Sequence, residues 1–246
     1  FGHWSNSPHS QARTGADTLL QAIELAEAAE ELGIDNASFR VHHYAQQHAS
    51  PFPLLAAIGA RTSTIEIGTG VIDMRYENPL YMAEDAGAAD LISGGRLQLG
   101  VSRGSPEQVI EGYRYFGYQP EEDDPQGAEM ARRNIEVFLK VIDGGRFAEP
   151  NPRPMFPNPH PGPLGIEPQS PGLRDRIWWG AASDATARWA ASHGMNLQSS
   201  TLKMYESDEP FHVQQRKQIE VFREAWAEAG WEREPRVSVS RSIMAI

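Results

Sequence analysis

Residues 79–104, PLYMAEDAGAADLISGGRLQLGVSRG, predict a helix that is followed directly by a buried strand. The helix predicted over residues 79–92 ends at the Gly94–Gly95 pair, because glycine adopts the left-handed conformation that terminates helices. The strand predicted over residues 96–101 has apolar residues at alternate positions: Leu97, Leu99 and Val101. A helix joined to a strand by so short a turn is typical of proteins in which the two elements alternate.

The same alternation is predicted along the rest of the chain. Helices are expected over residues 14–32, 51–60, 106–116, 127–143, 184–193 and 210–230. Strands are expected over residues 36–44, 65–71, 177–180, 195–199 and 237–246, with a further strand ending near residue 4. Seven strands that alternate with helices predict a parallel sheet with right-handed crossovers.

We therefore expect a single α/β domain over residues 1–246, a (β/α)₈ TIM barrel that is truncated or partly missing at its C-terminal end. The sequence begins at Phe1 as if inside a strand and ends on a predicted strand, which suggests a trimmed version of a longer chain. An open doubly wound sheet is the alternative. No G-x-G-x-x-G motif lies between a strand and a helix, which weakens that alternative.

Composition excludes several classes of function. The net charge of −11 argues against binding to nucleic acid or to an anionic membrane, and the absence of cysteine excludes disulfides and thiolate metal sites. No apolar run approaches the roughly 18 residues of a membrane span, and no signal peptide is evident. We expect a cytoplasmic protein with no metal site.

Residues 149–172 interrupt the alternation with nine prolines, which disfavour helix interiors and strand pairing. We interpret this Pro-rich excursion as a long loop rather than a linker between two domains. Long loops often form lids or rims around a site, although a surface segment without a functional role fits equally well.

Polar and small residues gather where the predicted strands end, which is where barrels place their active sites. His42 and His43 offer an imidazole that exchanges protons near neutral pH, or are two ordinary polar residues. Adding His48 gives a spacing that suits no usual zinc site. Gly70 would let a flat ligand approach the backbone, or would mark a barrel corner.

Two further strand ends suit an anion. The guanidinium of Arg103 can pair with a phosphate through two hydrogen bonds, or can form an ion pair across the rim. The small residues 180–183 lead into a helix whose first N–H groups and dipole favour a phosphate. The same turn is equally compatible with a simple connection in which Ser183 caps the helix.

Four segments, in this order and spacing, resemble the bacterial luciferase-like flavin-dependent monooxygenase family. They are residues 40–62 with RVHHY and SPFPLLAAIGART, residues 67–85 with IGTGV, NPL and AED, residues 90–104 with DLISGGRLQLGVSRG, and residues 177–183 with IWWGAAS. Each motif alone is only weakly specific for the family, and the specificity comes from the order and spacing of all four.

The resemblance implies the role of each strand end. His42 would line the flavin and substrate pocket as the catalytic residue, and Thr69, Gly70 and Val71 would pass against the flavin ring with a non-proline cis peptide at Gly70–Val71. The other implied cofactor contacts are Ser102, Arg103, Gly180, Ala181, Ala182 and Ser183, with Arg103 at the FMN phosphate. The substrate candidates do not come from the resemblance: they are His3 and Trp4, which end the first predicted strand. Other large side chains could also line a pocket, although most are expected in the core: Met74, Tyr76, Tyr113, Trp178 and Trp179. Val41 and Ala181 stand where relatives often carry acidic residues, so those contacts are missing or moved.

The function implied is oxygenation of a small organic substrate with dioxygen and reduced FMN, supplied by a separate NAD(P)H:flavin reductase. A homodimer is implied by the same resemblance. Three alternatives stay open. They are an F420-dependent oxidoreductase on the same fold, a non-catalytic flavin-binding protein, and a barrel unrelated to flavin that holds a sugar phosphate at residues 180–183.

Overall fold

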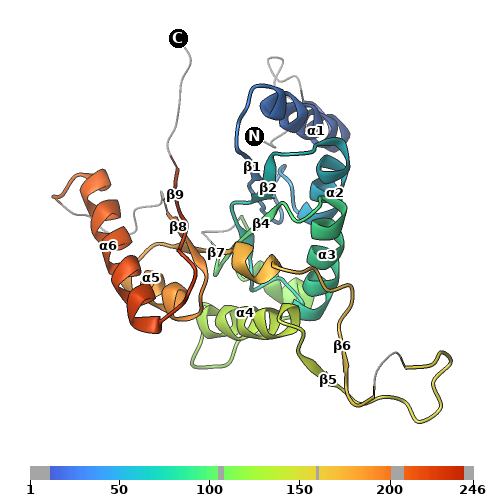
Figure 1. Ribbon diagram of the computed structural model, residues 1–246. Coiled ribbons are helices and arrows are strands. Elements are labelled where there is room, and N and C mark those ends of the chain that lie inside the picture. The colour runs from blue at the N-terminus through green and yellow to red at the C-terminus, as the bar shows by residue number, and fades with distance from the viewer. Residues whose placement is uncertain (1–11, 105–107, 159–160, 201–207, 241–246) are drawn as a thin grey trace.

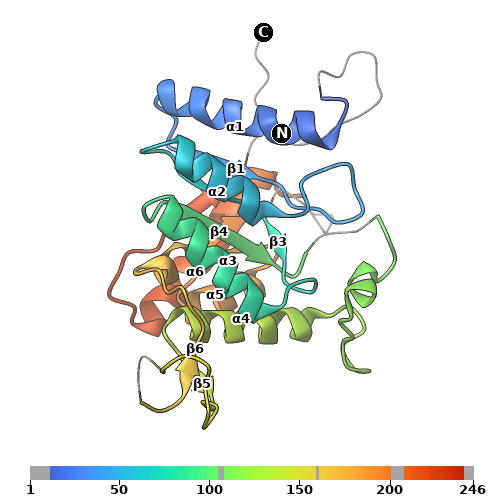
Figure 2. The same ribbon diagram turned by 90° about the vertical axis from the view of Figure 1, so that its right-hand side faces the viewer.

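The computed structural model describes residues 12–104, 108–158, 161–200 and 208–240, and its centre is one curved parallel sheet (Figures 1 and 2). The strands are paired in the order in which the chain forms them. They are β1 (Asn36–Phe39), β2 (Glu66–Thr69), β4 (Leu97–Ser102), β7 (Ile177–Ala181), β8 (Asn196–Ser199) and β9 (Val237–Val239), and the short β3 (Ile72–Asp73) pairs with β4.

The helices lie on the convex side of this sheet (Figure 1). They are α1 (Gly15–Glu31), α2 (Pro51–Arg61), α3 (Pro79–Ile92), α4 (Ala128–Ile142), α5 (Asp184–Ser192) and α6 (Phe211–Ala229), with short 3₁₀ helices η1 (Gly112–Phe116) and η2 (Leu173–Arg176). Local signals set their starts: Thr14 forms a capping box with Asp17, and the Asn78 side chain accepts the N–H groups of Leu80 and Tyr81.

The predicted alternation is confirmed, but the sheet is an open arc. In the described residues, β1 and β9 form its two edges and do not pair with each other, so a closed eight-stranded barrel is not observed. A half-barrel whose strands follow chain order is the arrangement that part of a TIM barrel would have. The first predicted strand, with His3 and Trp4, lies outside the described residues.

Three predicted elements are wrong in extent. The strand expected over residues 36–44 ends at Phe39, so His42 and His43 lie in the following loop. The helix expected over residues 106–116 is limited, in its described part, to the 3₁₀ turn η1. The strand expected over residues 65–71 ends at Thr69, and the chain re-enters the sheet only at β3.

The Pro-rich excursion also differs from expectation, because part of it does form a ladder. Strand β5 (Arg146–Ala148) pairs antiparallel with β6 (Leu164–Gly165), and the segment between them projects from the body of the protein (Figure 1). The pairing is possible because the nearest prolines, at positions 150 and 163, flank the paired residues without belonging to them.

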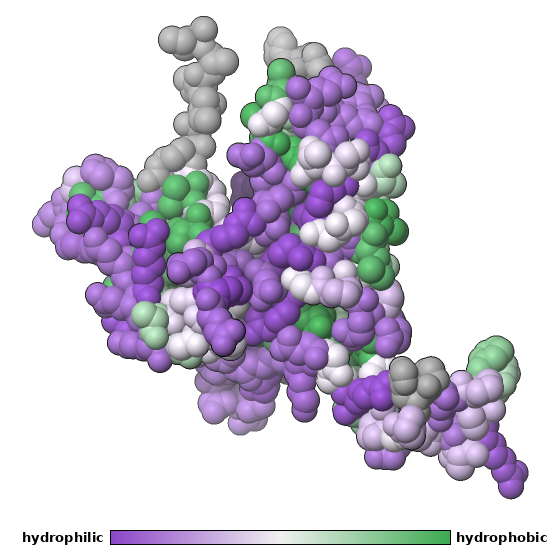
Figure 3. All heavy atoms as spheres, viewed as in Figure 1, coloured by the Kyte–Doolittle hydropathy of each residue, from purple (hydrophilic) through white to green (hydrophobic). Residues whose placement is uncertain are grey.

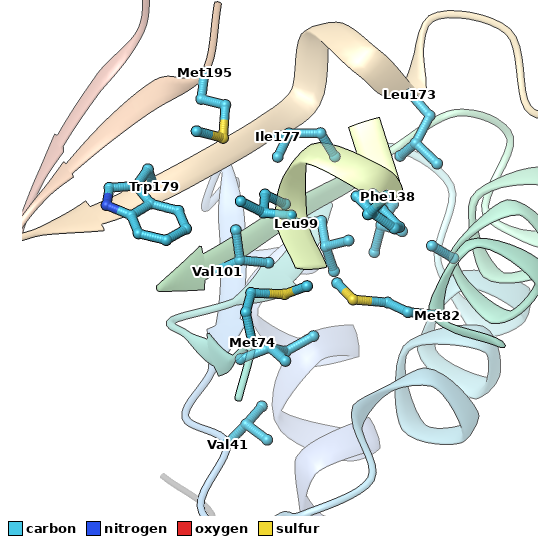
Figure 4. Close-up of a cluster of buried hydrophobic side chains, with 14 of the residues drawn as sticks. Val41, Met74, Met82, Leu99, Val101, Phe138, Leu173, Ile177, Trp179 and Met195 are labelled. Carbon is cyan, nitrogen blue, oxygen red and sulfur yellow. The ribbon is translucent and has the colours of Figure 1, made fainter. Parts of the chain in front are cut away.

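The main core fills the space between the sheet and its helices. Leu99 and Val101 of β4 and Ile177 and Trp179 of β7 meet Phe138 of α4 there, and Figure 4 shows these side chains together. The strand residues of this core stand at alternate positions, which is the pattern that the sequence predicted for residues 96–101.

The opposite face of the sheet carries a polar network. Gln98 donates to Glu66 (3.0 Å) and accepts from the indole N–H of Trp178 (2.8 Å). Two nitrogens of Arg236, next to β9, donate to the two carboxylate oxygens of Glu66 at 2.7 and 2.8 Å. The concave face is therefore joined by hydrogen bonds from β2 to the last strand.

The molecular surface is largely hydrophilic on the face drawn in Figure 3, with small separate apolar areas. Among the helices of the described residues, none has both the length and the apolar character needed to cross a bilayer.

Candidate functional site

Three of the predicted strand-end segments meet at one point of the structure. A Cβ atom added to Gly180 would lie 3.3 Å from Cβ of Ser102 and 3.3 Å from Cγ1 of Val71. The meeting follows from the topology, since β3 and β7 both pair with β4 and parallel strands end at the same edge. Packing this close favours glycine at position 180, because any side chain there would displace its neighbours.

The link between β2 and β3 is held at both ends. The Thr69 hydroxyl donates to the Gly100 carbonyl (2.7 Å), and the Gly70 N–H donates to the Phe39 carbonyl (2.8 Å). The side chain of Gln198 donates to the Thr69 carbonyl (3.2 Å). The peptide bond between Gly70 and Val71 is cis, as the sequence resemblance predicted.

Gly70 leaves its backbone open to a ligand. The residue is exposed, and a Cβ added to it would meet no atom of the described residues within 4 Å. An uncovered peptide beside the Val71, Ser102 and Gly180 contact gives a flat ligand space to lie against the backbone.

His42 is half-buried and bonded to a cation. Its ring Nε2 lies 2.9 Å from Nη2 of Arg40, and its backbone N–H donates to the His48 carbonyl (2.9 Å). Burial, and then the charge of Arg40, lower the pKa of His42 below its ordinary value. A guanidinium only donates, so Nε2 accepts and the neutral ring carries its proton on Nδ1. His42 therefore offers one N–H donor at neutral pH.

His43 faces a different environment from His42. Its ring stacks on Tyr76 with 4.2 Å between centroids and meets Phe116 edge-on at 5.0 Å. The two rings diverge because the chain turns in the loop at residues 40–44, not because a strand alternates its side chains.

Arg103 is exposed beside the strand tips. Its Nη1 donates to the side-chain oxygen of Gln126 (3.2 Å), and within the described residues this neutral amide is its side-chain partner. The predicted alternative, an ion pair across the rim, is therefore not observed in that part of the chain. The neighbouring Ser102 hydroxyl accepts the N–H of Gly104 (2.8 Å) and shapes the turn that presents Arg103.

The turn at residues 180–183 is a well-formed helix start. Ser183 caps α5 as predicted: its hydroxyl accepts the Thr186 N–H (3.3 Å), and the Thr186 hydroxyl accepts the Ser183 N–H (3.2 Å). Ala181 is buried and its carbonyl accepts the N–H of Ser200 (3.0 Å), whereas Ala182 is exposed. The simple capping interpretation accounts for Ser183, and an anion role for this turn stays a prediction.

Sequence reasoning missed a charged cluster directly after the cis peptide. Asp73 and Arg75 form a buried ion pair with Nη2 2.6 Å from Oδ2, and a Cβ on Gly104 would overlap the Asp73 carboxylate. Burial, and then the charges of Asp73 and Asp85, raise the pKa of Glu77 to about 7. The signal available in the sequence was the alternating D-x-R-x-E at residues 73–77.

The tryptophans and other large residues weighed as pocket walls are mostly core, as expected. Trp178, Trp179 and Tyr113 are buried, and Met74 is fully buried. These four side chains therefore stabilise the body under the site and leave the exposed surface to other residues.

Comparison with known proteins gives an independent result. The family model described as luciferase-like monooxygenase matches residues 1–245. The oxygenase component of the flavin-dependent trigonelline monooxygenase of Acinetobacter baylyi is 24% identical over 197 residues, covering 79% of this chain and 52% of that protein. The F420-dependent glucose-6-phosphate dehydrogenase of Nocardia farcinica is 33% identical over 133 residues, covering 51% and 38%.

Solved structures show the same fold. The oxygenating constituent of 3,6-diketocamphane monooxygenase from Pseudomonas putida, in complex with FMN, has a TM-score of 0.69 at 18% identity. The match covers 97% of this chain and 66% of that one. The chain spans about half the length of the curated relatives that it matches over most of its own length.

Proposed function

We propose, because this chain belongs to the luciferase-like monooxygenase family, that it binds reduced FMN and uses dioxygen to oxygenate a small organic substrate. One observation carries the proposal. Val71, Ser102 and Gly180 meet beside the open backbone of Gly70, with the exposed guanidinium of Arg103 at the same strand edge.

The residues present fit a flat cofactor with a phosphate. Arg103 would hold the phosphate, since a guanidinium donates two parallel hydrogen bonds to such an anion. The peptide of Gly70 and Val71 would support the ring, and Ser102, Ala181, Ala182 and Ser183 would border it with small side chains. Bound FMN supplies the electrons for the reaction, and the protein supplies position and proton control.

His42 is the proposed proton-handling residue. Its neutral ring holds a proton on Nδ1 while Arg40 occupies Nε2, so the imidazole has one defined donor to offer a reacting group. The positive charge of the Arg40 guanidinium also disfavours protonation of the His42 ring, which keeps the neutral form present below pH 7.

Partners follow from the proposed chemistry. Reduced FMN must come from elsewhere, and we propose a separate NAD(P)H:flavin reductase, which agrees with a relative that is named an oxygenase component. A homodimer is a proposal that rests on the family resemblance. A cytoplasmic location and the substrate role of His3 and Trp4 are proposals that rest on the sequence alone.

A second candidate is an F420-dependent oxidoreductase that transfers hydride without oxygen. The relative from Nocardia farcinica, which is named an F420-dependent dehydrogenase, supports this candidate. The deazaflavin also joins a flat ring to a phosphate, so the same strand tips would serve both cofactors.

Direct binding separates these possibilities. The purified chain is titrated with FMN, riboflavin and F420 in separate experiments, followed by fluorescence, and then with reduced FMN without oxygen before air is admitted. We expect FMN to bind more tightly than riboflavin and F420, and the complex with reduced FMN to consume oxygen once air is admitted. Preference for F420 would support the second candidate, and failure of all three to bind would overturn both.

A further inference from the structure

Five aromatic rings form a continuous surface at the edge of the sheet where the strands end. We call His43, Tyr44, Tyr76, Tyr115 and Phe116 the aromatic rim. Its centroid distances are 4.2 Å for His43–Tyr76, 5.0 Å for His43–Phe116, 5.1 Å for Tyr76–Phe116, 6.1 Å for Tyr44–Phe116 and 6.3 Å for Tyr44–Tyr115. The rings come from three separate segments: the loop after β1, the residues after β3, and η1.

The rim is exposed on its outer side and buried on its inner side. Tyr115 is 79% exposed, Phe116 50% and Tyr44 48%, whereas Tyr76 is 5% exposed. A group of large rings left open to water on a firmly packed base is a recognised mark of a binding surface. A ligand on the rim could therefore contact exposed rings at the surface and the buried ring of Tyr76 beneath them.

The two outer segments are fixed to each other. The Tyr44 hydroxyl donates to the Gly112 carbonyl (3.2 Å), and Arg114 pairs with Glu111 at 3.0 Å. Tyr44 and Glu111 have φ of 55° and 48°, and among the described residues these are the two non-glycine positions with positive φ. Such backbone outliers tend to gather at functional sites. Both flank the rim, so the structure maintains this arrangement at a conformational cost.

The rim lies beside the candidate site. His43 follows His42 in the chain, and Tyr76 lies three residues after Asp73, which pairs with Ser102 in the sheet. In Figure 2 the tips of β3 and β4 point to the side of the molecule that carries the loop after β1. A ligand on the rim would therefore be close to the strand tips.

The charges beside the aromatic rim indicate which class of ligand it would bind. Glu111 and Arg114, the ion pair within this surface, neutralise each other, so the rim offers ring faces and edges more than net charge. Aromatic rings prefer stacked or edge-on neighbours at centroid distances of about 4.5–7 Å. An uncharged, planar aromatic compound satisfies such a surface better than an aliphatic compound of equal size.

We propose that the aromatic rim is the substrate-recognition surface, and that the substrates of this protein are planar aromatic compounds without charge on the ring. This inference rests on the proposed function, because it makes the rim the substrate side of the same site.

A matched pair of probes tests the inference. Binding of 2-naphthol and of its saturated counterpart decahydro-2-naphthol is measured by calorimetry on the 246-residue chain. We compare the double variant Tyr115→Leu/Phe116→Leu with the control Tyr81→Leu, which removes a tyrosine of similar exposure from α3. We expect 2-naphthol to bind about tenfold more tightly than the saturated probe, and the double variant to remove most of that difference. Tyr81→Leu should leave it unchanged.

Two results would overturn the inference. One is equal binding of the two probes, or a 2-naphthol affinity that the double variant leaves intact. The other is conversion of a dimer to a monomer in the double variant, measured by sedimentation, because the rim would then be a subunit interface. FMN binding is measured in the same samples. If neither the wild type nor the variants bind FMN, but the wild type still binds 2-naphthol, the proposed function is refuted and the inference about the aromatic rim is not.

Discussion

Replacing Glu77 by glutamine is expected to stabilise the protein in mildly alkaline solution and to have little effect in acid. The folded protein raises the pKa of Glu77 from 4.5 to about 7, first by burial and then through the charges of Asp73 and Asp85. Below pH 4.5 the carboxyl is protonated in both the folded and unfolded states, so its contribution to stability is fully present. That contribution is lost as the pH rises through the folded pKa, because the folded state must then hold a half-buried carboxylate beside two other acidic groups.

The size of the effect follows from the two pKa values. At about 1.4 kcal/mol per tenfold change in protonation, a pKa of about 7 in place of 4.5 corresponds to about 3 kcal/mol above pH 7. Glutamine has no proton to lose, so Glu77→Gln should gain up to about that amount at pH near 8 and little at pH near 5.

The assay is urea unfolding followed by circular dichroism at these two pH values. Glu84→Gln, a change at an exposed position of α3, is the matched control and should alter stability at neither pH. A Glu77→Gln protein that is less stable than the wild type at the higher pH would refute the reasoning. An equal gain at both pH values would also refute it, since the effect would not come from the proton.

Four further changes test other parts of the protein. Arg40→Gln removes the charge that lowers the pKa of His42, so the acid limb of the kcat/KM profile should move to higher pH; an unmoved limb would exclude His42 as the group titrating there. His42→Ala should lower the rate of product formation by about 10²–10⁴-fold, measured as kcat, with FMN affinity retained. Arg103→Ala should weaken FMN by about tenfold or more and riboflavin hardly at all, whereas the surface control Arg216→Ala should affect neither. Asp90→Ala should lower the free energy of unfolding by about 3–5 kcal/mol, because the buried Asp90 carboxylate accepts bonds from Leu97, Ser170 and Arg176.

The sequence was sufficient for the features that depend on local order. Alternating apolar residues located β4, and Ser183 marked the start of α5. The convergence of Val71, Ser102 and Gly180 then follows, because neighbouring parallel strands end at one edge. The cis peptide at Gly70 was predicted through the family resemblance and not from any physical signal in the residues.

Features that depend on contacts between distant segments were not predictable in the same way. The pattern of residues 36–44 suits a continuous strand, but pairing with β2 stops at Phe39, and the chain then turns so that His42 and His43 face different partners. The Asp73–Arg75 pair becomes buried because the sheet register places Ser102, and with it Gly104, against Asp73. Periodicity within one segment contains no information about that register.

The η1 region illustrates a conformational limit. Its sequence suits a helix, yet Glu111 adopts a left-handed backbone that interrupts the α-helical path, and only a 3₁₀ turn follows. A non-glycine residue with positive φ leaves no compositional trace, so a pattern of residue types predicts the wrong element here.

The bond between Glu66 and Arg236 joins positions that are 170 residues apart, near the two ends of the sheet. Loop-closure entropy makes so distant a contact slow to establish, and we expect it only once the intervening strands are paired. Energy transfer between a donor and an acceptor dye placed beside these positions would therefore report when the two ends of the curved sheet move apart. Their separation would increase before circular dichroism registered any loss of helix.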